Sequence, residues 1–333
     1  MTSLVPLIET YRGGTLENQH FGVVAVVDSQ GRVLAHAGDP QRLVFTRSTL
    51  KALQALPLME AGGPKLFGFA REQVAMMCAS HSGEAMHVTQ VQGMLDKTGL
   101  STGTLQCGCH VPYFTELGLP AGKFDERHNN CSGKHAGFLA WCVQHGQPVA
   151  NYLAPAHPLQ QAIRRDVARA VGLAADDLKM GIDGCSAPNF AMPLASLARG
   201  YARLATGAAD SEFGESFAQL ADAMTAHPDL VSGTGRSDQA FMRAGRGDWV
   251  TKVGAEGVQA FASRSRQQAF AIKMVDGNKV ALFAAVVAVL DQLGWLDARQ
   301  REELRPWRAE AIANARGTQV GERKPVFTLT PSR

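Results

Sequence analysis

The apolar and polar positions near the N-terminus follow the pattern of β-strands. Two runs, residues 22–28 and 32–37, are apolar and rich in β-branched side chains, and the turn-forming sequence Asp28-Ser29-Gln30-Gly31 joins them. The sequence therefore predicts that the chain opens with a β-hairpin.

After Phe45 the spacing of apolar residues changes to that of a helix, which Gly62-Gly63-Pro64 would end. The buried face of this helix would carry Leu50, Leu53, Leu56 and Met59. Residues 70–245 read mostly as helices separated by loops rich in Gly, Pro and Asn. Conspicuous polar residues lie in these loops, where a rigid scaffold often places chemistry.

Strand patterns return near the C-terminus, at residues 249–258, 269–275 and 279–286, with a hairpin turn at Asp276-Gly277-Asn278. A helix is expected from about 286 to 300, packed on the resulting sheet. Both ends of the chain therefore contribute strands to one sheet.

A sheet from both chain ends around a helical middle is an α+β arrangement. We expect one unit over residues 1–333, with a sheet part at about 1–45 and 246–300 and a helical part at about 46–245. Residues 317–333 show little periodicity and are expected to form a tail. The functional site is expected in the cleft between the two parts.

Composition and charge limit the possible partners. Hydrophobic residues make up 45% of the chain, enough for a substantial core, whereas 19% are charged and the formal net charge is +3 without a charge block. We therefore expect a small-molecule substrate, no nucleic acid and no membrane. The N-terminus lacks a signal-peptide pattern and the six cysteines are too sparse for a disulfide scaffold, so we expect a cytoplasmic protein.

Ser48 and Lys51 are the first candidate catalytic pair. Three residues apart on a helix, they share one face, and a neutral lysine amine could deprotonate the serine hydroxyl. Read alone, the same residues are also the polar first turn of an ordinary amphipathic helix.

Two further segments could complete such a site. Ser80 lies in a loop of small residues, although Ser82 followed by Glu84 could equally begin a helix. Lys252 precedes Gly254 on a predicted strand, where a ligand could approach closely beside a positive charge, although a lysine there is commonly just solvated. The order of these elements follows the layout of serine β-lactamases and penicillin-binding proteins.

Two other loops combine thiols with possible ligands. Residues 127–135 place Cys131 among imidazoles and an amine, and residues 181–189 hold Asp183 and Cys185. Two thiolates and a carboxylate that orients a ligand suit Zn²⁺.

Three alternatives for these cysteines remain open from the residues alone. Cys131 with a neighbouring imidazole could be a nucleophile. The loop Cys107-Gly108-Cys109-His110 is a rival metal loop. All of them could also be buried free cysteines that pack as small hydrophobes.

Taken together, the chain resembles the rhizobial-type (class 3, asparaginase II or thermolabile) L-asparaginase family from about residue 22 to 295. The segments that carry this resemblance are Arg47-Ser48-x-x-Lys51, Ser80-His81-Ser82-Gly83-Glu84, Asn129-Asn130-Cys131-Ser132-Gly133-Lys134-His135, His157-Pro158-Leu159-Gln160, Asp183-Gly184-Cys185 with Ala187-Pro188, and Lys252-x-Gly254-Ala255-Glu256-Gly257.

The resemblance implies a β-lactamase-like fold, usually a homodimer, that hydrolyses L-asparagine to L-aspartate and ammonia. It implies two Ser-Lys tandems, Ser48 with Lys51 and Ser80 with Lys252. Ser48 would be the nucleophile, and Arg47 is the expected partner of the substrate carboxylate.

The resemblance also implies a zinc ion near the nucleophile. Its ligands would be Cys131, Lys134 and Cys185, with water as the fourth. Asp183 would lie beside these ligands and help to bind the substrate. We expect the metal to act in substrate binding more than in bond cleavage.

Three rival functions follow from the same residues. A penicillin-interacting serine hydrolase on the same fold would react with a β-lactam. A cysteine amidase would use Cys131 with His135. A non-catalytic protein would bind a ligand and use zinc only for stability.

Overall fold

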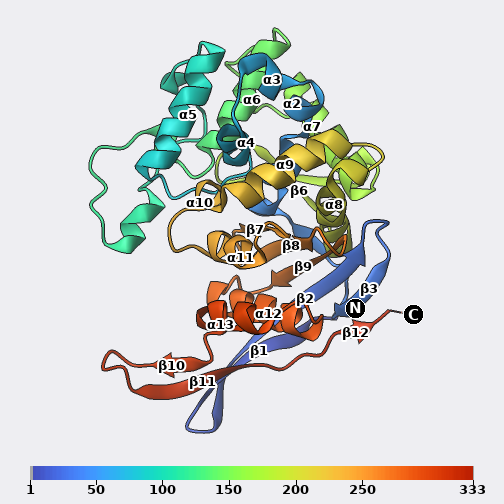
Figure 1. The fold of residues 1–333 in the computed structure, drawn as a ribbon, viewed down its shortest axis with the longest axis vertical. Coiled ribbons are helices and arrows are strands. Elements are labelled where there is room, and N and C mark those ends of the chain that lie inside the picture. The colour runs from blue at the N-terminus through green and yellow to red at the C-terminus, as the bar shows by residue number, and fades with distance from the viewer. Residues whose placement is uncertain (1–2, 333) are drawn as a thin grey trace.

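Within residues 3–332, which the computed structural model describes, strands come mainly from the two chain ends and most helices from the middle (Figure 1). The strands are β1 (Val5–Arg12), β2 (Thr15–Asp28), β3 (Val33–Ala37), β4 (Leu43–Phe45), β5 (Lys179–Ile182), β6 (Pro188–Pro193), β7 (Trp249–Gly254), β8 (Val258–Ser263), β9 (Gln268–Met274), β10 (Ala311–Ala313), β11 (Gln319–Pro325) and β12 (Thr330–Pro331).

The α-helices are α1 (Lys51–Gln54), α2 (Leu56–Glu60), α3 (Gly63–Phe67), α4 (Arg71–Met77), α5 (Ala85–Thr98), α6 (Ser132–Gln144), α7 (Pro158–Val171), α8 (Leu194–Thr206), α9 (Gly214–Ala226), α10 (Pro228–Val231), α11 (Ser237–Gly245), α12 (Lys279–Gln292), α13 (Ala298–Glu303) and α14 (Arg305–Arg308). The 3₁₀ helices are η1 (Arg47–Leu50), η2 (Thr102–Thr104), η3 (Tyr113–Leu117), η4 (Glu126–His128), η5 (Ala175–Asp177) and η6 (Gly207–Ala209).

The main sheet of the described chain has nine strands in the order β10-β11-β1-β2-β9-β8-β7, with β3 beside β2 and β12 beside β3. Its pairings are antiparallel. A smaller antiparallel sheet, in the order β4-β6-β5, belongs to the helical part. The predicted α+β fold, with an antiparallel sheet from both chain ends, is therefore confirmed.

Strand β2 explains why the sheet separates two layers of helices. Val23, Ala25 and Val27 pack into the core of the helical part. Val24 and Val26 point to the other face, where α12 packs. Because both faces of β2 are buried from Gly22 to Val27, this half of the strand is a continuous apolar run rather than an alternating one.

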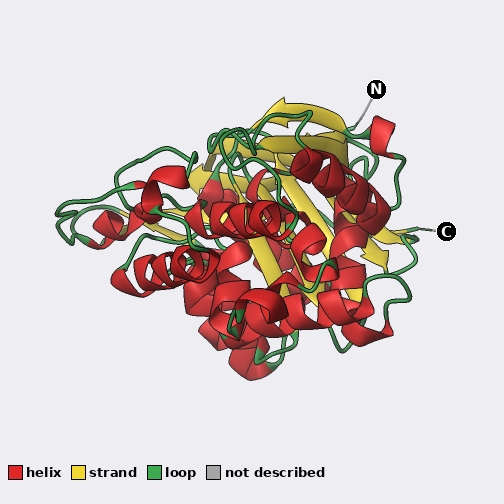
Figure 2. Cartoon of the chain, turned by 90° about the horizontal axis from the view of Figure 1, so that it is seen from above, coloured by secondary structure: helices red, strands yellow, loops and turns green. Residues whose placement is uncertain are grey.

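The layers are visible in the figures. Helix α8 contacts β2, β8 and β9 from the side of the helical part. Helices α12 and α13 lie on the opposite side of the sheet (Figure 1). Viewed from the helical side, helices and loops cover much of the strands (Figure 2).

The prediction of a strand at residues 279–286 is wrong, because these residues begin helix α12. The side chain of Asn278 accepts a hydrogen bond from Ala281 N at 2.9 Å, so the predicted hairpin turn is instead a helix N-cap. Most of the helix is buried, so its apolar positions do not show a helical period. It ends at Gln292, and α13 follows separately.

The prediction of a tail at residues 317–333 is also wrong over the described part. Strand β11 pairs with β1, with Ile8 opposite Pro325, and the blue and red ends of the chain lie side by side (Figure 1). These strands carry mostly polar, partly exposed side chains. Strands of this kind leave little hydrophobic signal in a sequence.

The predicted helix after Phe45 is broken into η1, α1 and α2. Pro57 lies in the first turn of α2, and a proline there has no N–H for the backbone carbonyl of the preceding turn. The predicted strand 249–258 is likewise two strands, β7 and β8, because a turn with positive φ at Glu256 and Gly257 reverses the chain.

Candidate active site

A cavity of about 440 Å³ lies where the two parts of the fold meet. The helical part contributes Ser48, Ser80 and Arg236 to its wall, and the sheet part contributes Val253 and Gly254 of β7. The structure therefore brings both predicted serines to one cavity in the predicted cleft.

Ser48 is placed by a braced turn. The preceding residue, Arg47, has φ of 50°, which is unusual for a residue other than glycine. The side chain of Asn189 holds this turn: its Oδ1 accepts from Arg47 N at 3.0 Å and its Nδ2 donates to Arg47 O at 3.0 Å. A strained backbone held by its surroundings is common at functional sites.

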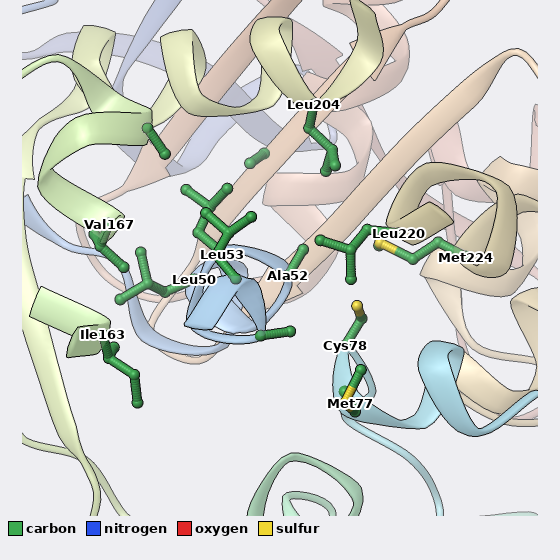
Figure 3. Packing of buried hydrophobic residues seen from close by; sticks show 14 of the residues in the cluster. Leu50, Ala52, Leu53, Met77, Cys78, Ile163, Val167, Leu204, Leu220 and Met224 are labelled. Carbon is green, nitrogen blue, oxygen red and sulfur yellow. The ribbon is translucent and has the colours of Figure 1, made fainter. Parts of the chain in front are cut away.

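The residues after Ser48 anchor the turn in the core. Leu50, Ala52 and Leu53 are fully or almost fully buried. Figure 3 shows them among side chains of the helical part such as Leu204 and Ile163. Close packing of this kind limits movement of the short helices that carry Ser48 and Lys51.

The buried amine of Lys51 connects three segments. Lys51 Nζ donates to Ala79 O at 2.5 Å and to Asn130 O at 3.2 Å, and lies 3.0 Å from Ser80 Oγ. The sequence predicted that Lys51 pairs with Ser48. In the described chain its hydroxyl partner is Ser80, while Ser48 lies on the wall of the same cavity.

Lys252 forms a buried ion pair that sequence reasoning missed. Its Nζ lies 2.7 Å from Asp238 Oδ2, and both side chains are almost inaccessible to solvent. Burial lowers the pKa of Lys252 to about 8, against the opposing effect of Asp238. The predicted partner was Ser80, but within the described residues Lys252 donates to Asp238 and to Val253 O.

The carboxylate of Asp238 accepts hydrogen bonds from several groups. Besides Lys252 it accepts from Val253 N at 2.9 and 3.1 Å and from Gln259 Nε2 at 3.1 Å. It lies in the first turn of helix α11, 14 residues before Lys252 in the sequence. Nothing in the sequence pattern connects the two residues, because only the packing of α11 against β7 brings them together.

The two predicted substrate-binding residues, Arg47 and Asp183, bind each other. Arg47 Nε donates to Asp183 Oδ1 at 2.8 Å. Both line a neighbouring cavity of about 420 Å³, which shares Glu256 with the cavity of the serines. The structure thus brings these residues together but places them beside the serine cavity.

Arg236 and Tyr113 face the serine cavity and were not predicted. The Arg236 Cζ atom lies 5.2 Å from the centre of the Tyr113 ring, and Arg236 Nη1 donates to Ser80 O at 2.7 Å. The signal available in the sequence was a glycine-rich stretch, Ser232-Gly233-Thr234-Gly235, directly before Arg236.

The predicted zinc ligands also meet. Lys134 Nζ lies 3.1 Å from Cys185 Sγ. The hydrogen bond from Cys131 and the charge of Lys134 lower the pKa of Cys185, whereas that hydrogen bond and burial raise the pKa of Cys131. Burial opposes the charge on Lys134, but the neighbouring thiolate outweighs it and raises the pKa of Lys134. The cluster therefore places two sulfur atoms and the Lys134 amine in one buried site, where Lys134 favours the charged form of the neighbouring thiol.

The donor set of this cluster fits a borderline-soft cation such as Zn²⁺, because two sulfur atoms and an amine converge. Beside it lies buried His135, whose Nδ1 bonds to Tyr152 Oη at 2.6 Å and whose interaction with Cys185 helps to lower the pKa of that thiol. No group of three His, Cys, Asp or Glu side chains suited to a metal occurs within residues 3–332. A metal held by this cluster would take Lys134 as its third protein donor.

The loop at Cys107, the alternative metal loop, makes structural contacts. Cys107 Sγ lies 3.6 Å from Glu126 O, and Asn129 holds the backbone of Cys107 and Gly108. The raised pKa of buried Cys131 opposes its use as a nucleophile.

The loop with Ser80 does not cap helix α5 through Ser82. Ser82 Oγ donates to Ser232 O at 3.0 Å, and the residue before α5 is Glu84. The loop therefore joins the segment that carries Arg236.

No helix in the described part of the chain has the length and apolar character needed to cross a bilayer. None of the curated proteins compared with the chain matches it.

Comparison with solved structures finds a β-lactamase from Mycobacterium bovis that is 16% identical, with a TM-score of 0.40. The similarity covers 81% of this chain and 94% of that chain. The family model of L-asparaginase II matches residues 8–325. That match spans nearly the whole sequence, and the chain therefore belongs to the L-asparaginase II family.

Proposed function

We propose that this chain hydrolyses L-asparagine to L-aspartate and ammonia in the cavity of Ser48 and Ser80. Family membership implies L-asparaginase activity. The observation that carries the proposal is the buried Lys51 amine, 3.0 Å from Ser80 Oγ, with Ser48 on the same cavity wall. A hydroxyl nucleophile needs such a base, and a buried lysine can supply it.

In the proposed reaction, Ser48 Oγ attacks the side-chain amide carbon of asparagine. The C–N bond breaks, ammonia leaves with the proton that Ser48 gave up, and an aspartyl ester remains on Ser48. Water then cleaves the ester and releases aspartate. Backbone N–H groups at the start of η1 are proposed to stabilise the oxyanion.

The position of Lys51 supports a role in proton transfer, because its Nζ donates to Ala79 O, Asn130 O and Ser80 Oγ at once. In the proposed reaction Lys51 acts as a neutral amine, and its lone pair takes the proton that the Ser80 hydroxyl gives up. Ser80 would then relay the proton between Ser48 and Lys51. The Lys252 ammonium, fixed by Asp238, would keep positive charge near this proton path.

Ser80 is a second candidate nucleophile, favoured by its contact with Lys51. Ammonia release by Ser48→Ala and Ser80→Ala separates the two. We expect Ser48→Ala to abolish turnover and Ser80→Ala to leave a slow reaction. Near-normal turnover by Ser48→Ala would remove Ser48 as nucleophile.

The same assay separates the rival functions. We expect ammonia from L-asparagine, with L-glutamine and a β-lactam tested beside it. Acylation by the β-lactam without asparaginase activity would favour a penicillin-interacting hydrolase. If a thiol reagent abolishes activity while Ser48→Ala stays active, a cysteine amidase is favoured. If none of the compounds is turned over, a non-catalytic binding protein is favoured.

We further propose that Cys131, Lys134 and Cys185 hold a zinc ion. Bound there, Zn²⁺ would supply an open position able to hold the amino acid head group of the substrate. Asn130, the neighbour of Cys131, lines the serine cavity, which supports a site close to the substrate.

Metal analysis of purified protein tests the zinc proposal. Wild type is expected to contain about one zinc per chain and Cys185→Ser clearly less. Cys142→Ser, at another buried cysteine, is the matched control. Equal zinc content in Cys185→Ser and wild type would remove the site.

We also propose a homodimer in the cytoplasm. Exposed apolar side chains on the small sheet, Leu43, Phe45 and Ile182, support an association surface. Light scattering and cell fractionation test the two statements.

A further inference from the structure

We propose that Arg236 binds the α-carboxylate of the substrate and thereby selects a free amino acid over its α-amide. This inference rests on the proposed asparaginase function. It replaces the expectation from the sequence that Arg47 has this role.

Arg236 reaches the cavity next to the proposed reaction centre. Its Nη1 donates to Ser80 O at 2.7 Å and, more weakly, to Ser232 O at 3.3 Å. The Arg236 Cζ atom lies 5.2 Å from the centre of the Tyr113 ring, which makes a cation–π contact. The positive charge of Arg236 is therefore held beside the backbone of Ser80, the residue that carries one of the hydroxyls in the cavity wall.

This charge has no acidic partner in the described chain. Within residues 3–332, no Asp or Glu oxygen lies at ion-pair distance from the Arg236 guanidinium. The hydrogen bonds of Arg236 within this range use Nη1, which leaves the N–H groups of Nε and Nη2 for a ligand. A planar fork of N–H donors matches a carboxylate in a bidentate pair.

Arg47 differs on each of these points. Its Nε donates to Asp183 Oδ1 at 2.8 Å, and its Nη1 lies 4.0 Å from Glu256. It lines the neighbouring cavity rather than that of the serines. Binding a substrate carboxylate there would first require breaking the contact with Asp183.

The loop of Ser80 holds the Arg236 segment in position. Ser80 N donates to Val231 O at 2.8 Å, and Glu84 accepts from Thr234 N at 3.0 Å. These bonds, together with that from Ser82, connect the catalytic loop to the segment before Arg236. They fix the spacing between a hydroxyl and a cation that recognition of one short substrate needs.

The dimensions of asparagine suit this spacing. Two carbon atoms separate its side-chain amide carbon from its α-carboxylate, roughly 4 Å when extended. A carboxylate bound by Arg236 would therefore leave the amide carbon within reach of the hydroxyls in the cavity wall. Removing the carboxylate charge should remove the contact without changing the reacting group.

The test compares two substrates and four proteins. L-asparagine and its α-amide are each given to wild type, Arg236→Gln, Arg47→Gln and Arg266→Gln, and loss of the side-chain amide is followed by NMR. Arg266 is the matched control because it lies over Trp295 at 5.6 Å, outside the lining of the serine cavity. Its substitution removes one arginine charge from the surface.

We expect Arg236→Gln to lower kcat/KM for asparagine roughly 10- to 100-fold, the effect of losing hydrogen bonds between charged groups. For the α-amide, which has no carboxylate, we expect a change of at most about twofold. Arg47→Gln and Arg266→Gln should not change the ratio between the two substrates. If Arg236→Gln folds poorly, Arg236→Lys, which keeps the charge but not the fork, should show a smaller selective loss.

Equal losses for both substrates in the folded variant would overturn the inference and assign Arg236 a structural role. A selective loss in Arg47→Gln instead would also overturn it and restore the expectation from the sequence. Absence of asparagine turnover in wild type would overturn the proposed function, and the inference with it.

Discussion

The buried pair of Lys252 and Asp238 gives the sharpest prediction about stability. In Asp238→Asn the carboxylate becomes a neutral amide of nearly the same size. The Lys252 ammonium, 2.7 Å from Asp238 Oδ2, then lies in a buried site without its counter-charge. The amide N–H₂ must also face Lys252, Val253 N or Gln259 Nε2, which are all donors.

The expected cost is about 3–5 kcal/mol in the free energy of unfolding at pH 7, the usual effect of removing one partner from a buried ion pair. An exposed pair of equal length behaves differently. Arg264 and Asp222 also lie 2.7 Å apart, but their side chains are 31% and 45% exposed. Asp222→Asn should therefore cost about 0–1 kcal/mol.

The loss of stability caused by Asp238→Asn should depend on pH. Burial lowers the pKa of Lys252 from 10.5 to about 8, so wild type gains stability from this group as pH rises from about 8 to 10.5. In Asp238→Asn this pKa falls below 8, because the charge that raises it is gone. The free energy of unfolding of Asp238→Asn therefore starts to rise at a lower pH than that of wild type. The difference in stability between the two proteins becomes smaller as pH rises towards 8 and is constant above pH 8.

Urea unfolding of wild type, Asp238→Asn and Asp222→Asn at several pH values between 6 and 9 measures both effects. A cost below about 1 kcal/mol for Asp238→Asn, like that of the exposed control, would refute the account of the pair. A deficit that widens between pH 6 and 8 would refute the account of its charge.

Three further predictions follow from the site and its support. Asn189→Ala leaves the backbone groups of Arg47 without their partners, so we expect a loss of about 1–3 kcal/mol in urea unfolding and a lower kcat; unchanged kcat would separate the turn from catalysis. Leu53→Ala empties a fully buried position and should cost about 2–5 kcal/mol in the same assay, with a smaller value contradicting close packing there. If the proposed zinc ion is bound, a metal chelator should lower the melting temperature of wild type but not of Cys131→Ser; equal shifts would count against the proposed site.

Uniform burial along an element helped the prediction from sequence in one case and misled it in another. The second half of strand β2, from Gly22 to Val27, is buried on both faces, and its apolar run predicted a strand and the hairpin with β3. Helix α12 is also buried on most sides, and there the same uniformity concealed the helical period. Strand β11 was missed for the opposite reason, because its side chains are polar and partly exposed.

The site shows a similar division. Residue types and spacing identified Ser48, Ser80 and Lys51. The fold brings both serines to the wall of one cavity, and Lys51 contacts Ser80. The partner of each charge depends on packing between distant segments, so the sequence could not show that Lys252 binds Asp238.

The arginine beside the cavity illustrates the same limit. Arg47 stood next to the predicted nucleophile in the sequence, but the turn with positive φ directs its side chain to Asp183. Arg236 is distant in sequence and reaches the cavity because the Ser80 loop binds its segment. Adjacency in the chain therefore did not show which arginine lines the serine cavity.

The central claim, that Ser48 is the nucleophile of an asparaginase, is tested most directly by locating the covalent intermediate. Wild type is mixed with L-asparagine, quenched with acid within the first turnover, digested and analysed by mass spectrometry. The account predicts an aspartyl ester on the peptide that contains Ser48, absent from Ser48→Ala. An ester on Ser80 or Cys131 instead, or ammonia release without any ester, would contradict it.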